Sequence, residues 1–211
     1  TRKELFAELG GFRADLHVGE DVDYCWRVQD RGHAVEYRPK GKVFHRHRNT
    51  LRAFCSRRFD YGTSEPLLQR LHRARPKTLL LPPAASLFWL FVALSLSEAK
   101  LVLIGLCGLV LLIDSGAAMQ KMRARRIPVG FSVVVISVLR GYLAFLFHLC
   151  AFVSRYYLLC IPPVFAFFPE AGLVLFGSHV LAGIGEYWIK KSGLTPLLFL
   201  LYFSLEQLSY Q

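Results

Sequence analysis

The stretch GEDVDYCWR, residues 19–27, places three carboxylates at the start of a run whose apolar residues recur at helical spacing. It predicts a helix over residues 21–31. Free backbone amides and the helix dipole favour anions at such a start, so Asp21 is either a helix cap or the general base of a reaction. Asp23 can pair with Arg27 four residues on, and we expect it to be an ordinary surface partner of that arginine.

The segments on either side of this helix predict two short strands and two further helices. A short helix over residues 5–11 should stop at its two glycines, and residues 33–38 alternate as a strand. A turn leads to a second strand over residues 42–45, which ends in His45, a residue type that can bind a metal ion. The pair Asn49-Thr50 can cap an amphipathic helix that lies on a membrane surface.

The charge of the chain is strongly basic and unevenly distributed. The 211 residues carry 26 Lys and Arg against 15 Asp and Glu, a formal net charge of +11. Residues 38–58 hold eight Lys and Arg and no acid. Such a stretch can meet nucleic acid, anionic lipid or a nucleotide diphosphate. No nucleic-acid-binding motif is present, and the position just ahead of an apolar half favours lipid and phosphate.

The second part of the chain predicts a membrane region. A membrane-spanning helix needs about 20 predominantly apolar residues. About four such helices are expected, the last of them broken by prolines, and a short final run predicts an interfacial helix or a truncated span. The runs are Leu79–Ser97, Leu101–Ile113, Val129–Val153, Tyr157–Trp188 and Leu194–Leu205. Residues 1–78 are therefore expected to be part of a soluble domain and residues 79–211 a helical membrane region.

The charged residues of this region predict its orientation. The loops with Lys121–Arg126 and Lys190-Lys191 are basic, so the positive-inside rule puts them in the cytoplasm together with the basic N-terminal part. Arg140, His148 and Glu170 lie at membrane depth, where polar groups face protein or water. They could line a substrate path or pair between helices, and pairing of Arg140 with Glu170 is favoured.

The order of the motifs in residues 10–45 resembles the acceptor half of the family 2 glycosyltransferases. These motifs are GGF at 10–12, GEDVD at 19–23, a glycine at 32, YRP at 37–39 and His45. Residues 57–64, RRFDYGTS, resemble the branch of that family associated with mycofactocin biosynthesis. The resemblance implies an α/β fragment, the acceptor half of a GT-A fold, followed by the helical membrane region.

The resemblance also implies roles for individual residues. Asp21 would be the catalytic base and Glu20 its acidic neighbour, while His45 would bind a divalent cation, Mn or Mg. Contacts to the diphosphate or the acceptor would come from four further residues, His47, Arg57, Arg58 and Trp26. Taken without the resemblance, the two histidines could equally belong to the basic patch.

The function that follows is inverting transfer of a sugar from a nucleotide-sugar donor to an acceptor hydroxyl. The acceptor would be either mycofactocin-type and peptide-derived or lipid-linked, and the enzyme would sit in the inner membrane with its catalytic part in the cytoplasm. The nucleotide-binding half with its DxD motif does not precede Asp21, so we expect a C-terminal fragment that is inactive alone. The alternative is a non-catalytic membrane module whose basic cytoplasmic domain binds anionic lipid or a partner protein.

Overall fold

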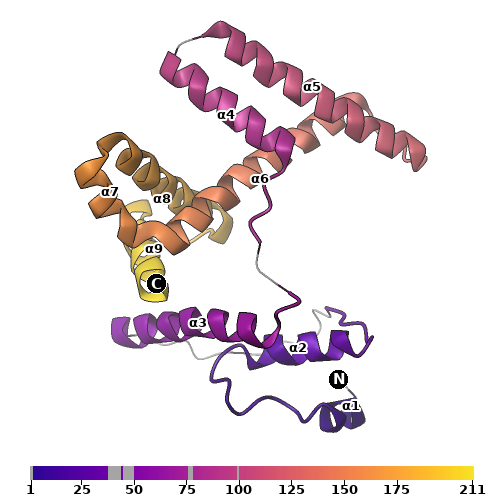
Figure 1. Cartoon of the computed structure of the whole chain (residues 1–211), viewed down its shortest axis with the longest axis vertical. Coiled ribbons are helices and arrows are strands. Elements are labelled where there is room, and N and C mark those ends of the chain that lie inside the picture. Colours follow the sequence, from indigo (N-terminus) through magenta and orange to yellow (C-terminus); the bar gives the residue numbers. More distant parts are fainter. Residues whose placement is uncertain (1, 38–43, 45–49, 76–77, 99) are drawn as a thin grey trace.

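The computed structural model describes residues 2–37, 44, 50–75, 78–98 and 100–211, and in these ranges the chain forms helices and no strand (Figure 1). Three helices make up the polar part and the others the apolar part. In chain order they are α1 (Lys3–Glu8), α2 (Glu20–Asp30), α3 (Leu51–Leu71), α4 (Pro83–Glu98), α5 (Leu101–Ala124), α6 (Phe131–Tyr157), a 3-10 turn (Leu158–Cys160), α7 (Ile161–Phe167), α8 (Pro169–Lys190) and α9 (Pro196–Tyr210).

The expected α/β fragment is wrong for the part of the chain that the structure describes. Residues 33–37 form no strand, and the amide of His33 bonds to the carbonyl of Val28 at 3.2 Å, at the end of α2. A strand exists only where a neighbouring strand completes its hydrogen bonds, and alternating residues cannot supply that neighbour. Of the second predicted strand, residues 42–45, the structure describes Phe44 alone, which is not in a strand.

Three stretches are long and apolar enough to cross a membrane, which indicates a membrane protein. They are α5, the α6–α7 segment Phe131–Phe167 and α8. The first expected span, Leu79–Ser97, is shorter in the structure, because the apolar part of α4 covers only Pro83–Leu96. At 1.5 Å per residue, a 16-residue helix reaches about 24 Å, less than the roughly 30 Å of a hydrocarbon core. The broken fourth run forms α7 and α8, each with proline in its first turn.

The predicted pairing of Arg140 with Glu170 is not among the ion pairs of the described residues, and both side chains are exposed. A different polar contact joins three helices of the apolar part. His179 of α8 is 4% exposed and lies 2.8 Å from Ser154 of α6 and 2.9 Å from Ser204 of α9. The hydroxyl of Ser204 donates to the carbonyl of Leu200, so it accepts from Nε2 of His179, and Nδ1 accepts from Ser154. All three helices are thus held by a satisfied polar chain.

Helix α3 confirms the predicted cap and connects the polar part to the apolar part. The hydroxyl of Thr50 accepts from the amide of Ala53 at 3.3 Å. Helix α3 then runs parallel to α9, and contacts recur every four residues on both helices. Phe54 meets Tyr202, Arg58 pairs with Glu206 at 3.3 Å, and Gly62 meets Tyr210. We call these three pairs the α3–α9 seam; Figure 1 shows the C-terminus close above α3.

Replacing Gly62 by alanine is expected to weaken the α3–α9 seam. A Cβ atom at Gly62 would overlap the carbonyl oxygen of Tyr210, so α9 must shift, at a cost of about 1–3 kcal/mol. The matched control is Gly116→Ala in α5, where a Cβ meets nothing within 4 Å and alanine should be neutral or stabilising. Thermal unfolding in detergent compares the two. Equal stability of both variants would contradict the close approach.

Candidate functional site

The centre of the polar part is a buried carboxylate, Asp23, with 1% of its surface exposed. Its Oδ2 accepts from Nε of Arg27 at 2.8 Å, and its Oδ1 accepts from Nε2 of His72 at 2.9 Å. The sequence predicted Arg27 as the partner of Asp23, but it placed Asp23 on the surface, which is wrong because its side chain is buried. His72 follows directly after α3, so Asp23 joins the two helices on which the site is built.

The same arginine holds the loop that precedes α2. One terminal nitrogen of Arg27 donates to the carbonyl of Leu9, and the other donates to that of Gly11 at 2.6 Å. Gly11 has φ +65°, and a Cβ atom there would lie 3.1 Å from the ring of Phe6. Glycine is needed at this position because an L side chain would be both strained and crowded. The GGF segment is therefore a structural support for α2.

The start of α2 is fixed against α3 by a second glycine. Gly19 has φ +84°, and a Cβ atom there would lie 2.9 Å from Cδ1 of Leu68. Its carbonyl accepts from the amide of Asp23 at 2.9 Å, which begins the helix. The first turn of α2 is thus held close to α3, and Asp21 is held with it.

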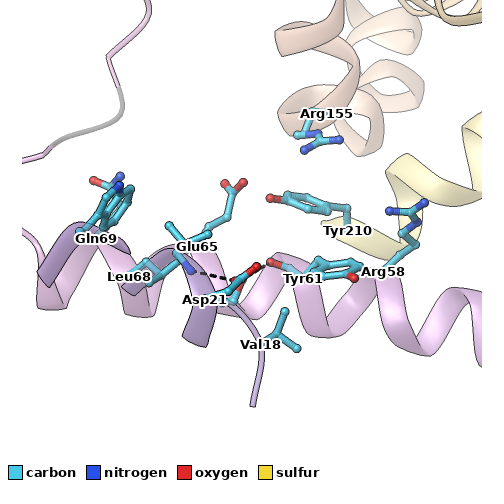
Figure 2. Close-up of a pocket in the computed structure, with 13 residues that line it drawn as sticks. Val18, Asp21, Arg58, Tyr61, Glu65, Leu68, Gln69, Arg155 and Tyr210 are labelled. Carbon is cyan, nitrogen blue, oxygen red and sulfur yellow. Dashed lines mark hydrogen bonds between the residues drawn. The ribbon is translucent and has the colours of Figure 1, made fainter. Parts of the chain in front are cut away.

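A pocket of about 460 Å³ lies where α2, α3 and the ends of α6 and α9 meet (Figure 2). Carboxylates, arginines and aromatic rings line it together. The lining residues are Val18, Gly19, Asp21, Val22, Trp26, Arg58, Tyr61, Ser64, Glu65, Leu68, Gln69, Arg155 and Tyr210. Such a mixture suits a polar ligand with hydroxyl groups and a flat or ring-shaped body, because charges orient it and rings pack on it.

The side chain of Asp21 is exposed to this pocket. Its Oδ1 accepts from the amide of Val22 at 2.8 Å, which leaves Oδ2 available to a ligand. Asp21 is not the cap of α2, because that position is held by Gly19 and the helix has no side-chain cap. Its role as a general base stays a prediction.

Three of the predicted site residues come together in this pocket: Asp21, Trp26 and Arg58. Two others lie beside it without lining it. Glu20 is half-buried at the first position of α2, and the guanidinium of Arg57 packs 5.0 Å from the ring centre of Tyr61. His45, the predicted metal ligand, and His47, a predicted contact to the diphosphate or the acceptor, lie outside the described residues.

The pocket also contains residues that were not predicted from the sequence, among them Tyr61, Glu65, Arg155 and Tyr210. In the view of Figure 2, Arg155, Tyr210 and the carboxylate of Glu65 lie across from Asp21. The guanidinium of Arg155 packs 4.3 Å from the ring centre of Tyr210. Burial, together with the nearby Glu65, raises the pKa of the Tyr210 phenol, so it stays a neutral hydroxyl near neutral pH.

Gln211, which follows α9, connects the end of α9 to the end of α6. The side-chain amide of Gln211 donates to the carbonyls of Arg155 at 2.8 Å and Ser154 at 3.3 Å, and its oxygen accepts from the amide of Leu159 at 3.1 Å. Arg155 lines the pocket and lies in the last turn of α6. Its distance in sequence from Asp21 gave no indication that the two share a pocket.

The described residues do not form a metal site by themselves. No group of three His, Cys, Asp or Glu side chains that could hold an ion occurs in the ranges the structure covers. In the pocket, the carboxylates of Asp21 and Glu65 are the oxygens of the type that divalent cations prefer. The expected divalent cation, Mn or Mg, therefore stays a prediction.

The chain is similar to two curated proteins, both named Pre-mycofactocin glycosyltransferase, from Mycobacterium tuberculosis strains CDC 1551 and H37Rv. Each match is 28% identical over 156 residues, which is 74% of this chain and 32% of the relative. The chain thus spans about a third of the length of the curated relatives it matches. No family model and no solved structure matches it. These similarities relate the chain to a glycosyltransferase.

Proposed function

We propose that the chain is part of a membrane-associated, inverting family 2 glycosyltransferase, in which the pocket around Asp21 binds the acceptor hydroxyl. The observation that carries the proposal is the position of Asp21, which opens into a pocket also lined by Arg58, Trp26 and Tyr61. The distant similarity to a glycosyltransferase supports it, as do three helices able to cross a membrane.

In the proposed reaction, the acceptor oxygen attacks the anomeric carbon of the donor sugar. Asp21 takes the proton of the hydroxyl as the new carbon–oxygen bond forms. The bond from the anomeric carbon to the diphosphate breaks, and the nucleoside diphosphate leaves with the electron pair. Arginines such as Arg58 stabilise the charge on the leaving group or hold the acceptor. Trp26 offers a ring face against which a sugar or an aromatic acceptor can pack.

The donor is proposed to be a nucleotide sugar held by a part of the protein outside these 211 residues. The match covers only 32% of the length of the curated relatives, so the rest of such a protein is long enough to hold a separate donor-binding part. We further propose that the polar part faces the cytoplasm at the inner membrane. Mycofactocin biosynthesis is the proposed pathway, because both relatives are named Pre-mycofactocin glycosyltransferase. A peptide-derived or a lipid-linked hydroxyl compound would be the acceptor.

The proposal is tested by sugar transfer in membranes that contain the complete protein encoded by the gene. Radiolabelled nucleotide sugars are supplied, and the labelled acceptor is isolated from the membrane or soluble fraction. Transfer by the complete protein and none by the 211-residue chain is the expected result. Binding to anionic vesicles without any transfer by the complete protein would instead favour a non-catalytic, lipid-binding module.

Chelation of divalent cations by EDTA is expected to abolish transfer by the complete protein, and added Mn or Mg should restore it. The expectation comes from the role predicted for His45, so His45→Ala should raise the metal concentration needed for half-maximal activity. The matched control is His33→Ala, a histidine after the end of α2 that is exposed. Full activity in EDTA would remove the cation from the proposal.

A further inference from the structure

A second pocket adjoins the one that contains Asp21, and it differs in chemistry. It has a volume of about 500 Å³ and is lined by Gly62, Glu65, Pro66, Gln69, Phe152, Tyr156 and Tyr157. Glu65 and Gln69 line both pockets. The two pockets are therefore neighbours along one side of α3, and a single extended ligand could occupy both.

The wall of the second pocket comes from a helix that is able to cross a membrane. Phe152, Tyr156 and Tyr157 all lie in the last turns of α6, within the candidate span Phe131–Phe167. Tyr156 and Tyr157 are 41% and 46% exposed, so this aromatic surface is not covered by the described part of the chain. We call the surface formed by Phe152, Tyr156, Tyr157 and Pro66 the aromatic groove.

One hydrogen bond marks the border between the polar pocket and the aromatic groove. The hydroxyl of Tyr156 donates to Glu65 at 2.8 Å, which orients the tyrosine so that its ring lines the groove while its hydroxyl meets the shared carboxylate. A ligand that crosses this border would meet polar groups on one side and rings on the other. That is the profile of an amphiphile, with a hydroxylated head and an apolar chain.

We propose that the acceptor is an amphiphile whose hydroxyl-bearing head occupies the pocket of Asp21 and whose hydrocarbon chain lies in the aromatic groove. The inference rests on the proposed function and names the acceptor class. A hydrocarbon chain is the occupant because the groove is continuous with the pocket and lies on a membrane-spanning helix, where lipid is the neighbouring solvent. Its chain would enter from the membrane while its head reaches the polar part.

The test uses a series of alkyl β-glucosides, from methyl to dodecyl, as acceptors for the complete protein in nanodiscs. Each added methylene that enters the groove is expected to raise kcat/KM about four-fold until the groove is filled. The KM for the donor should stay constant along the series. Phe152→Ala should flatten the dependence on chain length, whereas Phe131→Ala should not. Phe131 is a matched control, because it is an exposed phenylalanine of the same helix outside both pockets.

A binding measurement separates this inference from the proposed function. A dodecyl glucoside with a diazirine in its chain is photo-crosslinked to the complete protein, and the labelled peptides are identified by mass spectrometry. Label on Phe152–Tyr157 that excess dodecyl glucoside displaces, and methyl glucoside does not, supports the inference even when no sugar is transferred. Transfer rates that do not depend on the alkyl chain length, or the absence of displaceable label at these residues, would overturn the inference. The proposed function would then still be decided by the transfer assay.

Discussion

Replacing Asp21 by asparagine is expected to lower sugar transfer by the complete protein about a hundred- to ten-thousand-fold, while donor binding stays intact. A general base contributes a factor of this size, and the amide keeps the shape of the side chain but cannot take the proton. The amide oxygen can still accept from the amide of Val22, as Oδ1 does at 2.8 Å, so the start of α2 should be preserved. Transfer rate and donor affinity are measured on the same membranes.

The matched control for this experiment is Asp15→Asn. Asp15 is an exposed aspartate of the same polar part, it pairs with Arg13 at 3.0 Å, and it does not line the pocket. Its replacement should leave transfer unchanged. Near-normal turnover by Asp21→Asn, with Asp15→Asn also active, would remove Asp21 from the role of base.

Replacing Asp23 by alanine is expected to destabilise the polar part by about 3–5 kcal/mol. Removing one partner of a buried ion pair leaves the other charge without compensation, and here both Arg27 and His72 lose their bond to the carboxylate. The loss should spread to the loop at Gly11, which Arg27 holds, and to the end of α3. Hydrogen exchange of the α2 and α3 amides in the intact chain measures the change locally.

Two comparisons make this result specific. Asp15→Ala removes an exposed pair and should leave exchange in α2 and α3 unchanged, since surface pairs contribute little. Asp23→Asn keeps an acceptor for one of the two donors and should cost less than alanine. Unaltered protection of α2 in Asp23→Ala would show that the buried carboxylate is not what holds the two helices together.

The local parts of the fold could be predicted from the sequence because their causes are local. The helix at Glu20–Asp30 follows from apolar spacing, and the cap at Thr50 follows from a hydroxyl three residues ahead of a free amide. The strand predicted at residues 33–38 was wrong for the described residues, because residues 33–37 alternate but have no paired neighbour in the described chain. Alternation fixes which side chains share a face and leaves the presence of a sheet open.

The candidate site was predictable on one side only. Asp21, Trp26 and Arg58 were predicted through the resemblance to a known family, whereas Arg155 and Tyr210 reach the same pocket from the ends of α6 and α9. Nothing in their local sequence marks them, because their position depends on the packing of α9 against α3. The burial of Asp23 was missed for a related reason, since its second partner, His72, is 49 residues away in the chain.

The α3–α9 seam has a consequence for building hybrid proteins from this chain. A junction between two proteins in the connection from α3 to α4 would separate the polar part from the apolar part, and the sequence alone shows no contact that it would break. In such a hybrid, Phe54, Arg58 and Gly62 would face the last helix of another protein, which lacks the residues that contact them here. A hybrid that replaces the apolar part should therefore keep α9, Pro196–Tyr210, together with the polar part.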